Sequence, residues 1–130
     1  MDFIIGGANQ GKRSYAAKKY TLKESQMIDA GTWDYTQKTA IACLYNYHLL
    51  VKRIKEPEQV MAITERILQE NPAIVIITDE IGYGIVPTDK EKRLWRERTG
   101  RACCYLAEQA DSMTRIVSGI PQILKKKQDS

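Results

Sequence analysis

The N-terminal stretch MDFIIGGANQGKRSYAAKKY (residues 1–20) determines how the rest of the chain is interpreted. Residues 2–6 form a short apolar run that leads directly into glycines, which predicts a buried strand ending in a turn. Residues 11–20 carry their apolar side chains at helical spacing and predict a helix. Between them lies Gly6, four residues and then Gly11-Lys12. Strand, GxxxxGK loop and helix in this order are typical of a phosphate-binding loop.

The chemistry of such a loop explains its residue types. Backbone N–H groups wrap the phosphates, the helix N-terminus adds positive potential, and the lysine contacts the terminal phosphates. The alternative is a glycine turn that only joins a strand to a helix. We expect Lys12 to be catalytic. The predicted nucleotide-binding residues are Gly6, Gly7, Ala8, Asn9, Gln10, Gly11, Lys12, Arg13 and Ser14.

Arg13 departs from the motif, which has Ser or Thr after the lysine. A hydroxyl there ligates Mg²⁺, and an arginine cannot, because its guanidinium only donates hydrogen bonds. Three interpretations stay open. Ser14 or a water replaces the missing ligand, Arg13 itself neutralises phosphate charge, or the site binds nucleotide without turning it over.

Composition sets the remaining bounds. The chain has 130 residues, 43% of them hydrophobic and 28% charged, with a net charge of +4, as in an ordinary globular domain. No apolar run is long enough to cross a bilayer, and we see no secretion signal. The three cysteines form no pair of CxxC units, so we expect reduced thiols, no structural zinc site and a cytoplasmic location. Nucleic-acid-binding signatures are absent, and we expect no nucleic-acid partner.

The rest of the chain alternates helices with buried strands. This pattern predicts one α/β domain over residues 1–130, with a small parallel sheet flanked by helices in three layers, as in P-loop NTPases. We expect three or four clear strands, a homo-oligomer that completes the small core, and a frayed basic tail over residues 121–130. The predicted elements are helix 36–54, helix 56–70, central strand 71–78, loop 81–89, helix 90–110 and last strand 113–121, with one weak strand within 25–35.

Two carboxylates follow the predicted central strand. Asp79 and Glu80 come directly after the β-branched run that ends at Thr78. Ligand groups gather at the carboxyl ends of parallel strands, where the phosphate loop also lies. Asp79 and Glu80 are therefore predicted catalytic residues that orient a substrate hydroxyl or hold Mg²⁺, with Asp79 as the metal ligand. The alternative is an acid that caps the next turn.

Three stretches together resemble one protein family. They are GGANQGK (6–12), TDEIGYGIVP (78–87) and RLWRERTGRACCYLAEQADSMTRIVSGIPQILK (93–125). In this order they are similar to the bifunctional adenosylcobinamide kinase / adenosylcobinamide-phosphate guanylyltransferase family of cobalamin biosynthesis. The resemblance covers about the first 20 residues and residues 73–124.

This resemblance implies a transferase that phosphorylates adenosylcobinamide with ATP or GTP and, as a second step, transfers GMP through a guanylylated histidine. By motif match, Glu80 is the family's acid, and Arg93 and Arg96 belong to an arginine-rich helix that we expect to bind the corrinoid substrate. The alternative is a non-catalytic nucleotide- or corrinoid-binding module. Arg13 favours that alternative, and so does the lack of a histidine before Trp33.

His48 is the single histidine of the chain. A histidine can act as a nucleophile that forms a phosphoramidate, so His48 is a catalytic candidate for the guanylyl step. The alternative is a helix histidine at the margin of the core.

Overall fold

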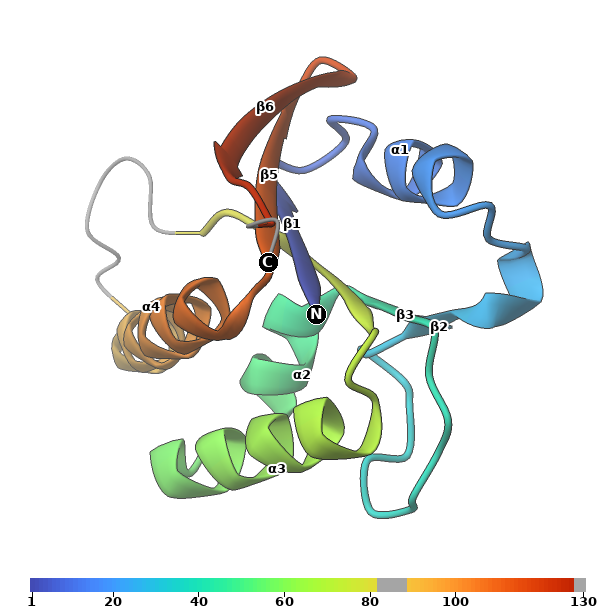
Figure 1. Cartoon of the computed structure of the whole chain (residues 1–130). Coiled ribbons are helices and arrows are strands. Elements are labelled where there is room, and N and C mark those ends of the chain that lie inside the picture. Colours follow the sequence, from blue (N-terminus) through green and yellow to red (C-terminus); the bar gives the residue numbers. More distant parts are fainter. Residues whose placement is uncertain (82–88, 128–130) are drawn as a thin grey trace.

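A six-stranded sheet in the order β2-β3-β4-β1-β5-β6 forms the centre of the molecule (Figure 1). The computed structural model describes residues 1–81 and 89–127. The strands are β1 (Asp2–Gly6), β2 (Met27–Asp29), β3 (Cys43–Tyr45), β4 (Val75–Asp79), β5 (Ser112–Val117) and β6 (Ile120–Lys125). The helices are α1 (Lys12–Lys19), η1 (Glu24–Gln26, a short 3-10 helix), α2 (Tyr47–Arg53), α3 (Pro57–Glu70) and α4 (Lys90–Gln109).

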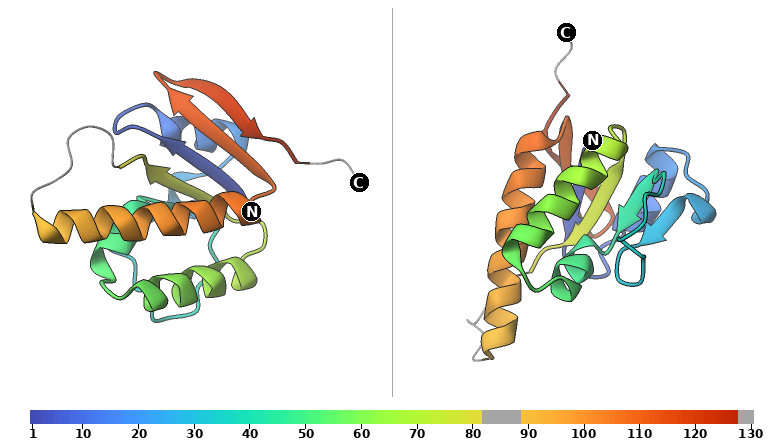
Figure 2. Two further views of the ribbon diagram at one scale, coloured as in Figure 1. Left: turned by 90° about the vertical axis from the view of Figure 1, so that its left-hand side faces the viewer. Right: turned by 90° about the horizontal axis from the view of Figure 1, so that it is seen from below.

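The helices cover both faces of the sheet and give three layers (Figures 1 and 2). Helix α1 packs on one face, where Ala16 joins Ile4, Ile77 and Ile116 in a small buried cluster. Helices α2, α3 and α4 cover the opposite face, over the larger apolar core. Because the strands carry apolar residues on both faces, they are buried on both sides, as parallel strands in α/β proteins are.

The predicted α/β class with a parallel sheet in three layers is confirmed. Strand β1 pairs in parallel with both β4 and β5, and β3 pairs in parallel with β2 and β4. The β-branched run before Asp79 forms β4, which lies inside the sheet as predicted. Helices α1, α3 and α4 occupy the predicted segments, and α3 has Pro57 in its first turn, where proline is tolerated.

The prediction of one helix over residues 36–54 is wrong. Cys43–Tyr45 is strand β3, and α2 begins only at Tyr47. Asn46 separates them with a left-handed conformation (φ 59°), which no helix interior contains. A short strand and a short helix in succession place apolar residues at three- and four-residue steps, and this spacing imitates a continuous helix. The sheet accordingly has six strands rather than three or four.

The prediction of a frayed tail from residue 121 is wrong for residues 121–125. They belong to β6, which pairs antiparallel with β5 through a tight turn. Ser118 and Gly119 form that turn with positive φ angles of 50° and 77°. The basic residues from Lys125 onward favoured a solvated tail, and the apolar residues before them were therefore not predicted as a strand. Ile120 and Ile123 are 69% and 54% exposed on this edge strand, and residues 128–130 lie outside the described part.

Helix α4 is the next element after β4 and begins at Lys90. Asp89 caps its N-terminus by accepting hydrogen bonds from the backbone N–H groups of Glu91 and Lys92. The predicted loop over residues 81–89 lies largely outside the described residues, and so does the whole GYGIVP stretch (82–87). Across residues 1–81 and 89–127, every helix is too short or too polar to cross a bilayer.

Candidate functional site

The carboxyl ends of β1 and β4 meet at one edge of the sheet and begin the site. Gly6, the last residue of β1, lies opposite Asp79, the last residue of β4. Gly6 also pairs with Ile116 of β5, so closely that a Cβ atom on Gly6 would lie 2.6 Å from the Ile116 carbonyl oxygen. Only glycine fits there. The chain therefore turns from β1 into the loop between two neighbouring strands.

The N-terminus of α1 is open toward this edge. Gly11 stands at the N-cap position with a φ of 89°, and no side chain caps the helix. The first turn carries no acidic residue. Uncapped N–H groups at a helix N-terminus form a site for anions, because they are donors without partners and carry the positive end of the helix dipole. The strand, glycine turn and helix that the GxxxxGK spacing predicts are present, and phosphate binding by the loop stays a prediction.

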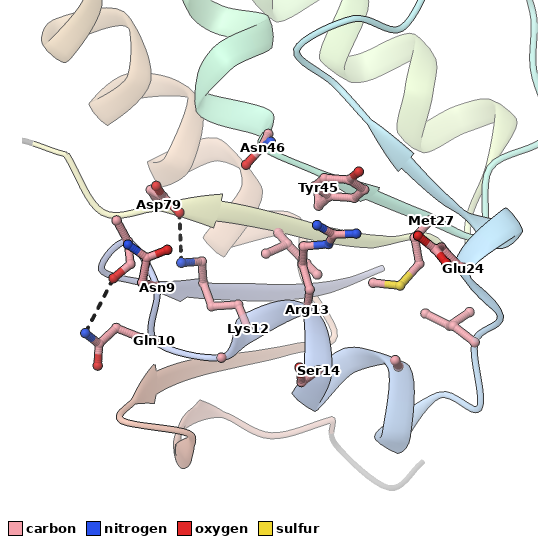
Figure 3. A pocket seen from close by; sticks show the side chains of 15 residues that line it. Asn9, Gln10, Lys12, Arg13, Ser14, Glu24, Met27, Tyr45, Asn46 and Asp79 are labelled. Atoms are coloured by element: carbon pink, nitrogen blue, oxygen red, sulfur yellow. Dashed lines mark hydrogen bonds and ion pairs between the residues drawn. The ribbon is translucent and has the colours of Figure 1, made fainter.

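Lys12 extends back across the loop and is almost fully buried, with 7% of its surface exposed. Its Nζ donates a 2.6 Å hydrogen bond to the carbonyl oxygen of Gly7 and lies 2.8 Å from Oδ1 of Asp79 (Figure 3). The Asp79 side chain is 25% exposed. A cation and a carboxylate thus meet at the end of the loop, and both are accessible to a ligand in the cavity that they line.

His48 lies behind Asp79. Its Nδ1 accepts a 3.1 Å hydrogen bond from the backbone N–H of Asp79, and its Nε2 lies 3.4 Å from Asp79 Oδ2. Since Nδ1 accepts, the proton of the neutral ring is on Nε2, facing the carboxylate. Burial lowers the pKa of His48, and the nearby Asp79 carboxylate offsets part of that effect. The lowered pKa favours the neutral ring, and His48 contacts Oδ2 of Asp79 whereas Lys12 contacts Oδ1.

The two predicted carboxylates diverge. Glu80 donates its backbone N–H to the carbonyl oxygen of Gly6, and its carboxylate pairs with Arg115 of β5, at 2.9 Å from Nε. Asp79 instead faces Lys12 and lines the cavity, whereas Glu80 does not line it. Adjacent residues at a strand end point to opposite sides, so one acid serves the loop and the other ties β4 to β5 across β1.

A cavity of about 580 Å³ extends from the loop along α1 toward β2 and β3 (Figure 3). The guanidinium of Arg13 lies over the ring of Tyr45, 4.0 Å from its centroid, on the wall of this cavity. Ser14 also lines it, with Asn46 and Glu24 farther along. The cavity thus combines the loop residues, including Lys12, at one end with an aromatic and polar wall beside them.

The β5–β6 turn forms hydrogen bonds with the loop, and this contact was not predicted from the sequence. The carbonyl oxygen of Gln10 accepts from Gly119 N–H at 2.8 Å, and its side-chain Oε1 accepts from Ser118 N–H at 2.6 Å. Only the SG pair within SGIP, a turn-forming dipeptide, could have pointed to it. The loop therefore depends on residues more than 100 positions away.

Arg93 and Arg96 lie on the first two turns of α4 and do not line the cavity at the loop. The structure thus brings Lys12, Asp79, His48 and the loop together, and it places the two arginines elsewhere. Trp95, between them, connects α4 to the site, because its indole N–H donates a 2.8 Å hydrogen bond to the carbonyl oxygen of His48.

The residues at the loop are compatible with Mg²⁺ if the phosphates of a bound substrate supply most of its coordination. Within residues 1–81 and 89–127, no three His, Cys, Asp or Glu side chains gather closely enough to bind a metal by themselves. Mg²⁺ usually keeps several waters and takes one or two carboxylates plus substrate phosphates. Asp79 supplies such a carboxylate beside the phosphate end of the cavity. Arg13 replaces the usual hydroxyl residue, and the next residue, Ser14, lines the same cavity and carries a hydroxyl.

Comparison with known proteins adds evidence that is independent of the loop. A family model described as cobinamide kinase / cobinamide phosphate guanyltransferase matches residues 33–124. The bifunctional adenosylcobalamin biosynthesis protein CobU of Salmonella typhimurium is 34% identical over 77 residues, which are 58% of this chain and 41% of that protein. The chain thus matches less than half the length of this relative. The family match begins after the phosphate loop, so the loop rests on its own spacing and geometry.

Proposed function

Because the chain belongs to the cobinamide kinase / cobinamide phosphate guanyltransferase family, we propose that it binds ATP or GTP at residues 6–14 and phosphorylates a hydroxyl of adenosylcobinamide. One observation carries this proposal. Lys12 and Asp79 form an ion pair at the mouth of an uncapped helix N-terminus, inside a cavity large enough for a small-molecule ligand.

In this reaction the acceptor hydroxyl oxygen attacks the γ-phosphorus, and the bond to the β–γ bridging oxygen breaks. The loop N–H groups and Lys12 stabilise the charge on the phosphate oxygens. Asp79 orients the acceptor hydroxyl or holds Mg²⁺ through its carboxylate, and the proton of the hydroxyl leaves to solvent or phosphate. Mg²⁺, when bound, supplies charge neutralisation at the phosphates.

We assign His48 the role of positioning Asp79. A nucleophilic histidine needs a lone pair that faces its substrate. The Nδ1 lone pair of His48 accepts from the backbone of Asp79, and Nε2 holds the proton toward the carboxylate. For this reason the kinase step is the better supported half of the proposal, and a guanylyl transfer through His48 would first require these contacts to break.

A second candidate function is nucleotide binding without turnover. Arg13 stands where the motif has a metal-binding hydroxyl, and its guanidinium lies over Tyr45 within the cavity. A guanidinium there can clamp phosphate without metal chemistry. Such a protein would be a nucleotide- or corrinoid-binding module derived from the family.

One experiment separates these functions. The protein is incubated with adenosylcobinamide, Mg²⁺ and either ATP or GTP, and both the corrinoid and the protein are analysed by mass spectrometry. A corrinoid heavier by one phosphoryl group, absent with Lys12→Ala, supports the kinase. A protein adduct of GMP mass that disappears in His48→Ala would restore His48 as the guanylyl acceptor. Nucleotide binding with neither product supports the second candidate.

A further inference from the structure

A buried arginine without a counter-charge lies between α2 and α4. Arg98 is only 8% exposed. Its Nη2 donates a 3.3 Å hydrogen bond to the carbonyl oxygen of Val51, and its buried Nε has no partner. In the described part of the chain it forms no ion pair. Charged side chains are rarely buried so fully unless they are paired, because the cost of removing a charge from water is several kcal/mol, in order of magnitude.

Arg98 lines two adjoining cavities, of about 440 and 180 Å³, where α3 and α4 run side by side (Figure 2). Both cavities are also lined by Arg101 and by Pro57 at the start of α3, and the smaller one by Lys55. Helix α3 spans 14 residues, and its N-cap residue Glu56 makes no side-chain capping hydrogen bond. Three cationic side chains and an uncapped helix N-terminus thus surround one hollow.

The larger cavity also has an apolar wall and an acidic margin. Val60, Met61 and Ala62 of α3 form the apolar part. Glu58 and Glu65 line this cavity and Glu97 lines the smaller one, yet none of the three forms an ion pair with Arg98 among the described residues. A ligand that fits these surroundings has an apolar body and one anionic group directed at Arg98.

We propose that this hollow, called here the α3–α4 site, binds a small organic anion with a carboxylate or phosphate group and an apolar body. It shares no lining residue with the cavity at the phosphate loop. Arg98 supplies the buried charge, and Arg101 supplies a second, exposed guanidinium. A guanidinium matches both anions because two of its N–H groups can donate in parallel to two oxygens.

A purely structural role for Arg98 is the competing explanation. Val51 lies near the C-terminus of α2, where the helix dipole is negative and a cation is favourable. This interaction accounts for one hydrogen bond of Arg98 and leaves Nε without a partner. A structural role predicts no ligand binding at all, so binding measurements distinguish the two explanations.

The test is a ¹H–¹⁵N NMR titration with benzoate, phenyl phosphate and the uncharged benzyl alcohol. We expect saturable shifts in residues 58–65 and 98–101 with benzoate, phenyl phosphate or both, and affinity at least about 10-fold weaker for benzyl alcohol. A response to benzoate alone identifies a carboxylate ligand, and a response to phenyl phosphate alone identifies a phosphate ligand. The Lys12→Ala variant, which has a weakened phosphate loop, should give the same shifts at the α3–α4 site.

Variants complete the test. Arg98→Met should weaken binding of the active probe by about 10-fold or more, and Arg98→Lys should weaken it less. Arg101→Gln, at an exposed position, should weaken it a few-fold. Arg66→Met, on the same helix α3 but outside the site, should leave it unchanged. Absence of saturable shifts, equal binding of benzyl alcohol, or full affinity in both Arg98→Lys and Arg101→Gln would overturn the proposal.

Discussion

Lys12 Nζ lies 2.8 Å from Asp79 Oδ1, so the cation of the loop and the carboxylate of β4 form one largely buried pair. A phosphate that binds the loop must share or replace this contact. Removal of Lys12 then has two effects, because it deletes a phosphate ligand and leaves the Asp79 charge facing the phosphates. We therefore predict that this pair influences what the loop binds.

We therefore expect Lys12→Ala to weaken ATP or GTP affinity on the order of 100-fold, as removal of one member of a buried charge pair does. Lys12→Ala/Asp79→Asn should bind more tightly than Lys12→Ala alone, because the repulsion is gone. Isothermal titration calorimetry measures both. Lys38→Ala, at an exposed position away from the cavity, is the control and should bind as the parent protein does. Tight binding by Lys12→Ala would refute the assignment of the loop.

Gly6 and Gly100 offer a matched pair of substitutions. Gly6→Ala would place a Cβ 2.6 Å from a backbone oxygen of β5, and we expect it to lower the free energy of unfolding by about 1–3 kcal/mol. Gly100 lies inside α4 with open space around its Cα, so Gly100→Ala should raise that free energy by up to about 1 kcal/mol. Urea denaturation followed by circular dichroism measures both changes. If Gly6→Ala raised the free energy of unfolding as Gly100→Ala is expected to do, the loop would not require glycine at position 6.

The pKa of His48 predicts a dependence of stability on pH. Burial lowers this pKa below that of the unfolded chain, which is about 6.5. The unfolded state then binds more protons, so the contribution of His48 to stability is fully present above about pH 6.5 and is lost as the pH falls below it. His48→Gln should lose that part of the pH dependence. The ring resonances of this single histidine report its protonation directly by NMR, and a pKa above 6.5 would contradict the prediction.

Arg13 and Tyr45 should act on nucleotide binding as a unit. If the guanidinium clamps phosphate from its position over the ring, Arg13→Ser should weaken triphosphate affinity about 10-fold, which is typical of one charged hydrogen bond. Tyr45→Leu should weaken affinity in the parent protein and have little effect when Ser already replaces Arg13. A double-mutant cycle measures this coupling. Undiminished affinity and faster turnover in Arg13→Ser would instead mean that the arginine displaced a useful metal ligand.

The sequence predicted correctly those parts of the structure that a short local pattern determines. The GxxxxGK spacing predicted the turn from β1 into α1, and the β-branched run before Asp79 predicted an inner parallel strand. The approach of Asp79 to Lys12 also followed, because parallel neighbouring strands end at the same edge. These features depend on short segments and on a general property of parallel sheets.

Features set by distant pairing could not be predicted in this way. Strand β3 has only three residues, and pairing with β2 and β4 defines it rather than its own pattern. Strand β6 depends on β5, and the bond from Ser118 to Gln10 joins residues 108 positions apart. Asp79 and Glu80 were predicted together because their different partners come from distant segments: Lys12 contacts Asp79, and Arg115 of β5 pairs with Glu80.

The hydrogen bonds between the β5–β6 turn and the loop determine when the loop can reach its final structure during synthesis of the chain. The loop is synthesised before the β5–β6 turn, so Gln10 gains its partners only once Ser118 and Gly119 have been made. Strand β1 likewise has no strand to pair with until β4 and β5 have been synthesised. The loop therefore gains these hydrogen bonds late, and a nascent chain that ends before Ser118 and Gly119 would have a loop without them.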